Sequence, residues 1–191
     1  MASRNVEQTT GQTVGVHLEP FRAADWSRLA GWVTDETQLL QWAGSLFHWP
    51  LDDAQLDAYL APAARAQPTR LIWRALETPG GEVVGHVELD EMNRRHRVAT
   101  LTRVLVCPER RGRGLGVALA AGALEAGFGG EGLHRIQLRV FDFNEPAIRC
   151  YESLGFRREG LLRDTRRIGQ TYWSSLVMSL LEDEWRPRKE P

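Results

Sequence analysis

Residues 104–119 read VLVCPERRGRGLGVAL, and this stretch decides the fold. An apolar run ends at Pro108, a basic turn with three alternating glycines follows, and an apolar helical run begins at Leu115. The start of a helix carries unpaired backbone N–H groups and a partial positive charge, so it attracts anions. Glycine has no Cβ, which lets a ligand approach the backbone closely. The order strand, basic glycine turn and helix therefore predicts a pyrophosphate site.

The spacing of the glycines separates this turn from two other phosphate sites. A dinucleotide fold uses G-x-G-x-x-G, and a P-loop places Lys and then Ser or Thr after its last glycine. Neither pattern stands here, because residues 111–116 read RGRGLG. This hexapeptide resembles the acetyl-CoA motif Q/R-x-x-G-x-G/A of the GCN5-related N-acetyltransferase (GNAT) superfamily. The resemblance implies that the bound pyrophosphate belongs to acetyl-CoA, the acetyl donor.

A second segment supports the same resemblance. Residues 144–156 read NEPAIRCYESLGF, which looks like the family's N-x-x-A-x-x-x-Y-E-x-x-G-F stretch. The two motifs stand in the family's order with a family-like gap, and the resemblance runs from about Val16 to Trp185. The N-terminal segment and the LLEDEW ending are similar to the RimJ/RimL-like branch of the family.

The resemblance implies an α+β fold, namely the GNAT-like acyl-CoA N-acyltransferase fold with a central, mostly antiparallel sheet of six to seven strands flanked by helices. We expect one domain over residues 14–186, a flexible tail at 1–13 and a short tail at 187–191. The residue pattern predicts strands at 14–19, 71–77, 82–90, 98–106, 135–140, 157–164 and 171–181. It predicts helices at 25–33, 35–42, 52–65, 115–128 and 145–154, the third with a capping box of Asp52 and Gln55.

The composition limits the class of protein. With 42% hydrophobic and 26% charged residues, the chain resembles an ordinary soluble globular domain. A net charge of −1 argues against bulk nucleic-acid binding, although arginines cluster at 94–97 and 110–113. No apolar run is long enough to span a membrane, and the N-terminal residues lack the apolar core of a signal peptide. We expect a cytoplasmic protein with two reduced cysteines and no metal site.

The resemblance implies which residues hold acetyl-CoA. The strand before the turn lends backbone groups to the pantetheine arm, the turn binds the pyrophosphate, and Asn144 donates to the arm. The predicted cofactor residues are Val104, Leu105, Val106, Arg111, Gly112, Arg113, Gly114, Leu115, Gly116, Asn144 and Tyr151. Asn144 also fits a helix N-cap with Pro146 in the first turn, and both roles can hold together.

Tyr151 is the predicted catalytic acid. When the acceptor amine attacks the thioester, CoA leaves as a thiolate, which a nearby phenol can protonate or hydrogen-bond. A free tyrosine has a pKa of about 10, so it is protonated at neutral pH. Helical periodicity alone would instead make Tyr151 a core residue beside Leu154, and the surrounding motif favours the catalytic role.

The general base is less well defined. Some family members carry a glutamate in an L-E-V context on the strand before the asparagine, whereas residues 138–140 read LRV here. On an earlier strand, His86, Glu88 and Asp90 alternate and share one face. That face is either plain solvent-exposed surface or part of the acceptor site. We hypothesise that Glu88 deprotonates or binds the acceptor amine.

The acceptor is a primary amine in the leading interpretation. The chain would transfer acetyl by direct attack in a ternary complex, either to a protein N-terminal amine or to a small-molecule amine. The aromatic segment 42–50 is expected to line the acceptor pocket, whereas Trp26 and Trp32 are expected in the core. The alternative is a non-catalytic acyl-CoA-binding regulator that lost its base, and a nucleic-acid-binding module is disfavoured. The last hairpin offers a surface for a homodimer.

Overall fold

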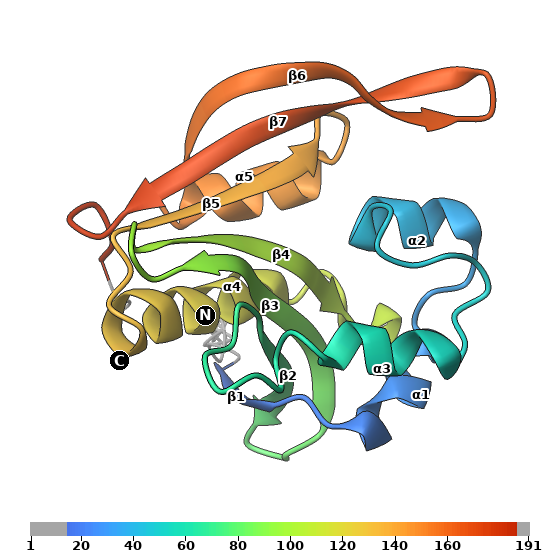
Figure 1. Ribbon diagram of the computed structural model, residues 1–191, viewed down its shortest axis with the longest axis horizontal. Coiled ribbons are helices and arrows are strands. Elements are labelled where there is room, and N and C mark those ends of the chain that lie inside the picture. Colours follow the sequence, from blue (N-terminus) through green and yellow to red (C-terminus); the bar gives the residue numbers. More distant parts are fainter. Residues whose placement is uncertain (1–14, 187–191) are drawn as a thin grey trace, which may run out of the picture.

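A single seven-stranded sheet organises the chain in a computed structural model, which describes residues 15–186. The expected tails at 1–13 and 187–191 therefore lie outside the described residues. The strands are β1 (Gly15–Pro20), β2 (Leu71–Thr78), β3 (Val83–Asn93), β4 (Val98–Val106), β5 (Arg135–Phe141), β6 (Arg157–Ile168) and β7 (Thr171–Leu181). Their order in the sheet is β1-β2-β3-β4-β5-β7-β6, and only β4 and β5 pair in parallel. The predicted mostly antiparallel sheet of six to seven strands is confirmed (Figure 1).

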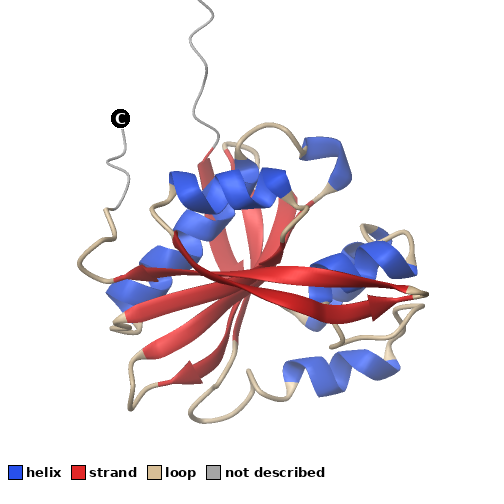
Figure 2. Cartoon of the chain, turned by 90° about the horizontal axis from the view of Figure 1, so that it is seen from above, coloured by secondary structure: helices blue, strands red, loops and turns tan. Residues whose placement is uncertain are grey.

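Helices lie on both sides of the strands, as Figure 2 shows. They are α1 (Trp26–Gly31), α2 (Glu36–Ala43), α3 (Ala54–Leu60), α4 (Leu115–Glu125) and α5 (Glu145–Ser153). Two buried clusters form the core. One contains Ala75 of β2 and the apolar residues of α4, and the other contains Ile72 of β2 and those of α1 to α3. Because side chains alternate along a strand, Ala75 and Ile72 point to opposite faces of the sheet, so each cluster covers one face.

The third helix is shorter than predicted. It ends at Leu60, before Pro62, and not at residue 65. The backbone N–H of Gln55 does donate to Oδ1 of Asp52 at 3.2 Å. The Gln55 side chain, however, binds the N–H and C=O of His48 and the C=O of Pro50. The predicted reciprocal capping box is therefore wrong, because Gln55 holds the preceding loop against the helix.

The C-terminal ends of three further elements differ from the predicted ranges by three residues or more. The helix after the glycine turn is α-helical to Glu125 and continues as a π-helical turn at Ala126–Gly130. Strand β3 reaches Asn93, and strand β6 reaches Ile168. A bulge interrupts β6 near its predicted end, where residues 163–165 stand opposite one residue of β7. Pairing with β7 then resumes, so the strand continues past residue 164. A bulge bends a strand without ending the pairing.

The middle of the sheet opens between β4 and β5. These strands pair only through Val98, Ala99 and Thr100 of β4. Beyond that point β4 bulges, because Arg103 and Val104 oppose the single residue Val87 of β3. The backbone of Arg103 has a φ of 50°, in the left-handed region. The divergence and the bulge turn the C-terminal half of β4 toward a cleft between the two strands.

Candidate active site

The glycine turn has the geometry that an anion site needs. Gly112 and Gly114 have φ angles of 78° and 79°, which favour glycine, and no atom lies within 4 Å of a Cβ built on either. Gly114 is the N-cap of α4 and has no side chain to cap it. The Nε of Arg111 donates to the C=O of Val106 at 3.2 Å, which ties the turn to the end of β4. The open turn thus presents a positive helix start to solvent.

A cavity of about 530 Å³ lies beside this turn. Of the predicted cofactor residues, those that line it are Val104, Val106, Arg111, Gly112, Gly114, Leu115, Gly116, Asn144 and Tyr151. Leu105 lines the larger cavity beside it instead, and its side chain packs in the core under α1 to α3. Arg113 is exposed and lines neither this cavity nor the larger one beside it.

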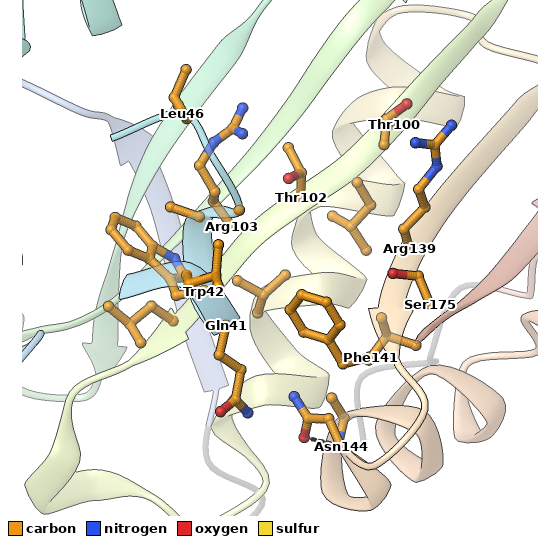
Figure 3. Close-up of a pocket in the computed structure, with 18 of the residues that line it drawn as sticks. Gln41, Trp42, Leu46, Thr100, Thr102, Arg103, Arg139, Phe141, Asn144 and Ser175 are labelled. Atoms are coloured by element: carbon orange, nitrogen blue, oxygen red, sulfur yellow. Dashed lines mark hydrogen bonds between the residues drawn. The ribbon is translucent and has the colours of Figure 1, made fainter. Parts of the chain in front are cut away.

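A larger cavity of about 940 Å³ fills the opening between β4 and β5. The C-terminal end of α2, the start of α5 and the β6–β7 hairpin complete its walls (Figure 3). The two cavities share wall residues, among them Val104, Asn144 and Tyr151. A ligand reaching through the glycine-turn cavity therefore meets a ligand in the larger cavity beside the phenol of Tyr151.

Tyr151 has two roles: its ring packs against the core, and the residue lines both cavities. Its side chain is half-buried, its ring meets Phe156 edge-on at 5.8 Å between centroids, and it borders both cavities. Burial raises the pKa of the Tyr151 phenol above its ordinary value of about 10. The phenol is therefore protonated across the physiological pH range and offers a hydrogen-bond donor where the cavities meet.

Asn144 caps α5 as the sequence predicts. Its Oδ1 accepts from the N–H of Ala147 at 3.4 Å, and its own N–H donates to the C=O of Phe141 at 2.9 Å. Pro146 stands in the first turn of the helix. Figure 3 shows the Asn144 side chain at the edge of the larger cavity. The capping bond uses only the oxygen, so the amide NH₂ is available for a ligand.

The face formed by His86 and Glu88 is buried, so the interpretation of this face as solvent-exposed surface is wrong. The two residues are 1% and 0% exposed. The Tyr59 hydroxyl lies 2.6 Å from Nε2 of His86 and donates to Oε1 of Glu88 at 2.5 Å. The Nδ1 of His86 lies 2.9 Å from the C=O of Arg103 and, because a carbonyl only accepts, is the donor. Burial lowers the pKa of His86. Helices α1 to α3 cover this face through Tyr59.

Glu88 lies in an ionic cluster under the cavity wall. Arg103 binds both of its oxygens, with Nε at 2.7 Å from Oε1 and Nη2 at 2.7 Å from Oε2. Arg70 approaches Oε2 to 3.6 Å, and both arginines also pair with Asp90. Asp90 lines the larger cavity, whereas Glu88 does not. The structure thus does not bring Glu88 to the place of an acceptor amine, contrary to the hypothesis that it acts as the base.

The aromatic segment divides between cavity and core. Trp42 and Leu46 line the larger cavity, and Phe47 packs against Trp42 with ring centroids 5.9 Å apart. Trp26 is buried in the same core cluster, as expected. Trp49 is exposed and lines neither cavity. Only the first half of segment 42–50 therefore contributes side chains to the larger cavity.

Two arginines of the larger cavity went unnoticed as binding residues in the sequence. Arg139 of β5 stood out only as the replacement of a glutamate, and Arg166 lay beyond the predicted end of its strand. The predicted arginine clusters behave differently. Arg94, Arg97 and Arg110 all form ion pairs with surface carboxylates.

Residues 15–186 contain no helix long and apolar enough to cross a membrane. Within the same range, no three His, Cys, Asp or Glu side chains come together as metal ligands would.

The strand divergence, the bulge of β4 and the glycine turn at a helix start define an acyl-CoA N-acyltransferase fold. The chain belongs to the Acetyltransferase (GNAT) family, whose model matches residues 36–156. A crystal structure of spermidine N-acetyltransferase from Vibrio cholerae in complex with CoA and spermine superimposes with a TM-score of 0.76. The alignment covers 88% of this chain and 96% of that one at 24% identity, which supports the fold.

Curated relatives include enzymes with different small acceptors. The spermidine N(1)-acetyltransferase of Escherichia coli (strain K12) is 35% identical over 105 residues, which are 55% of this chain and 56% of that protein. The chain thus spans about half the length of this relative. The L-amino acid N-acetyltransferase of the same strain is 31% identical over 120 residues, covering 56% of this chain and 74% of that protein.

Proposed function

We propose that this protein transfers an acetyl group from acetyl-CoA to a primary amine. The proposal rests on one observation: the two cavities adjoin at Tyr151, which lines both. Acetyl-CoA would occupy the cavity beside the glycine turn, with its pyrophosphate at the start of α4 and its thioester near the phenol. The acceptor would enter through the larger cavity. The two substrates then react directly in a ternary complex.

The reaction needs little covalent chemistry from the protein. The amine nitrogen attacks the thioester carbon, the C–S bond breaks, and CoA leaves as a thiolate. Tyr151 donates a hydrogen bond to that thiolate. A thiol has a pKa of about 8.5, and the buried phenol has one above 10, so full proton transfer from the phenol is uphill. The phenol therefore acts mainly by stabilising the leaving sulfur, and solvent supplies the proton.

The amine proton also has to leave, and neither Asp90 nor Glu88 is well suited to accept it. Burial raises the pKa of Asp90, but hydrogen bonds from Arg70 and the backbone, with the charges of Arg70 and Arg103, hold it below its ordinary value. Glu88 is closed off from the cavity by its arginines. We assign Glu88 as a positioning residue for the bulge of β4, and the amine proton passes to water.

The acceptor in this proposal is a small-molecule amine. Relatives named for spermidine and for L-amino acids support that class. The RimJ/RimL-like resemblance also predicts a protein N-terminal amine as the acceptor, and this stays a prediction. The homodimer formed through the last hairpin stays a prediction as well. The proposal assigns both substrate sites to the single domain predicted for residues 14–186.

Thermal melting with and without acetyl-CoA tests the cofactor site. Ligand at about 100 times its Kd adds about 2.7 kcal/mol of stability, which raises the Tm of a domain this size by about 5–10 °C. Gly114→Asp places a carboxylate at the start of α4 and should abolish the shift. Gly169→Asp is the matched control, because Gly169 has a φ of 56° and equally open surroundings but lies in the β6–β7 turn.

Release of free CoA thiol in the presence of amines then separates an enzyme from a non-catalytic regulator. An enzyme acetylates at least one amine, and mass spectrometry detects the amide. A regulator shows the acetyl-CoA melting shift with no amide from any acceptor. Absence of the melting shift itself would remove the proposed function.

A further inference from the structure

We propose that Arg139 and Arg166 form an anion-binding subsite in the larger cavity. The acceptor is then a small amine that also carries an anionic group, and not a polyamine. This inference rests on the proposed acetyl transfer, because it assigns the substrate class of the same site. Among the described residues, carboxylates of the protein neutralise some arginines of the cavity and leave others without an ion pair.

The larger cavity is rich in arginine. Among the described residues that line it, two are acidic, Asp90 and Glu91, whereas five are arginines: Arg70, Arg103, Arg111, Arg139 and Arg166. An amine with three positive charges meets unfavourable electrostatics there. Glu91 lies at the Thr100 end of the cavity, where its Oε2 accepts from the Thr100 hydroxyl at 2.8 Å.

Two of the five arginines already have carboxylate partners. Arg70 and Arg103 are balanced by Glu88 and Asp90 in the buried cluster, with the shortest Arg70 contact at 2.8 Å to Asp90. Arg111 belongs to the glycine turn and borders the cofactor cavity as well. The charge left for an acceptor comes from the two remaining arginines.

Arg139 is an exposed arginine in the splayed half of β5. Figure 3 shows its guanidinium pointing toward Thr100 of β4, across the cavity from Arg103. Arg135, four residues earlier, shows what a paired arginine on this strand looks like: Glu159 binds it at 2.7 and 2.6 Å. Within the described chain, Arg139 has no such carboxylate. The N–H donors of its guanidinium are therefore available to a ligand.

Arg166 of β6 also lines the cavity. The bulge at residues 163–165 precedes it, and its Nη1 donates to the C=O of Thr165 at 2.8 Å. Its Nη2 lies 4.0 Å from where a Cβ on Gly44 would stand, at the end of α2. Figure 1 shows the β6–β7 hairpin extending over α2. In the part of the chain that the structure describes, Arg166 forms no ion pair, and most of its donors are unused.

Two unpaired guanidinium groups match a carboxylate or a phosphate, which accept paired N–H donors. The same charges also help the chemistry. A positive field disfavours an ammonium ion, so it lowers the pKa of the acceptor amine and increases the neutral, nucleophilic fraction. This effect reduces the need for a carboxylate base beside the amine.

The uncharged walls point to the rest of the acceptor. Trp42, Leu46 and Phe141 all line the cavity, with Leu46 on the same side as Trp42 in Figure 3. Such surfaces favour an apolar side chain. The chemical class that fits charge and shape together is an amino acid, or a similar amine with an anionic group, that has an apolar or aromatic side chain.

Matched acceptor pairs test the inference. L-Phenylalanine and 2-phenylethylamine differ only by the carboxylate, and phosphoethanolamine and ethanolamine differ only by the phosphate. Spermidine represents the polyamines. We expect kcat/KM at least tenfold higher for the anionic member of one pair than for its neutral partner, and spermidine to be poorer still. The pair that shows the difference identifies carboxylate or phosphate as the anion.

Variants assign the effect to the two arginines. Arg139→Gln and Arg166→Gln should each raise KM for the anionic acceptor by about tenfold, the loss expected for one charge-assisted hydrogen bond. Each should raise KM for the neutral partner by a clearly smaller factor. Arg163→Gln is the control, because Arg163 is exposed on the same strand and does not line the cavity. A preference for spermidine, or an equal loss for both members of a pair, would overturn the subsite.

Product binding keeps this test separate from catalysis. With CoA present, N-acetyl-L-phenylalanine should raise the Tm more than N-acetyl-2-phenylethylamine, and the difference should vanish in the Arg139→Gln variant. If no amine is acetylated, the proposed function fails while this comparison still decides whether the cavity binds anions. Equal Tm shifts for both amides, with neither anionic acceptor preferred, would contradict the anion subsite.

Discussion

Glu88 and Arg103 join β3 to the bulge of β4 through a two-point ion pair, with Nε to Oε1 and Nη2 to Oε2 both at 2.7 Å. The backbone of Arg103 is left-handed, a conformation that costs a non-glycine residue about 1 kcal/mol or more. Its carbonyl accepts from Nδ1 of His86. Buried charges and hydrogen bonds thus hold the strained residue that shapes the cavity wall.

Glu88→Gln should destabilise the protein more than it slows the reaction. Removal of one partner from a buried ion pair leaves Arg103 and Arg70 undercompensated, which costs about 3 kcal/mol and lowers the Tm by about 6–12 °C. We expect kcat to fall less than tenfold, with an unchanged pH profile. Urea unfolding and steady-state kinetics measure both effects.

The surface variant Glu131→Gln serves as the control for that experiment. Its ion pair with Arg94 is partly exposed, so its loss should change stability little. A Glu88→Gln protein with unchanged Tm, a large loss of kcat and a shifted acidic limb of the pH profile would restore Glu88 as the general base.

Tyr151→Phe should lower kcat by about 100-fold while leaving the KM for acetyl-CoA nearly unchanged. The phenol acts on the leaving sulfur, so its loss affects the transition state and not the binding of the donor. The ring contact with Phe156 survives in phenylalanine, and the Tm should therefore stay close to that of the original protein. Because burial raises the phenol pKa, activity should not decline from ionisation of Tyr151 below about pH 10. A kcat within threefold would exclude the phenol from the mechanism.

The glycine turn and its flanking elements could be predicted because they depend on local rules. Strand β4 and the start of α4 match the predicted residues, since a proline just after the strand, at Pro108, and glycines with left-handed φ leave few alternatives. The capping role of Asn144 is local as well. These elements carry most of the predicted cofactor residues.

The burial of Glu88 could not be predicted in the same way. Alternation puts His86 and Glu88 on one face but does not say what covers it. The covering residue, Tyr59, stands 29 positions earlier than Glu88, and the neutralising Arg103 stands 15 positions later. A single sequence gives no sign that these side chains meet. An isolated carboxylate usually stays in water, which made exposure the simpler expectation.

Arg166 was missed for a different reason. The residue pattern predicts that the strand ends at 164, whereas residues 163–165 form a bulge after which pairing with β7 resumes. A bulge changes the direction of the chain and re-aims the side chains that follow. Three residues of irregular pairing thus brought an arginine into the cavity.

Stability should fall below about pH 6.5 because of His86. Burial lowers the pKa of His86 in the folded protein, so the ring stays neutral there while the unfolded chain binds a proton near pH 6.5. The unfolded state then holds more protons, and its free energy drops relative to the folded state. The free energy of unfolding should fall by up to about 1.4 kcal/mol per pH unit from pH 6.5 toward the folded-state pKa.

Urea titrations at pH 8, 7, 6 and 5.5 measure this slope. His86→Gln should be less stable at pH 8, because it loses ring contacts with Phe21 and Trp42, yet it should lose the slope between pH 6.5 and 5.5. The same slope in the variant would mean that another group titrates.

The glycines of the turn should differ in what they tolerate. Gly112→Ala puts a Cβ on a left-handed residue at the open surface, which costs about 1–2 kcal/mol and narrows the approach of a phosphate. Gly116→Ala adds a Cβ inside α4 at 3.9 Å from Sγ of Cys150 and 4.0 Å from Cγ2 of Val106, both ordinary contacts. Alanine there favours the helix by up to about 1 kcal/mol. We expect Gly112→Ala to weaken acetyl-CoA binding about tenfold or more, whereas Gly116→Ala binds normally and melts at a higher temperature. Isothermal titration with acetyl-CoA and thermal melting check both expectations, and equal loss of binding in the two variants would mean that the phosphate contacts α4 one turn deeper than Gly112.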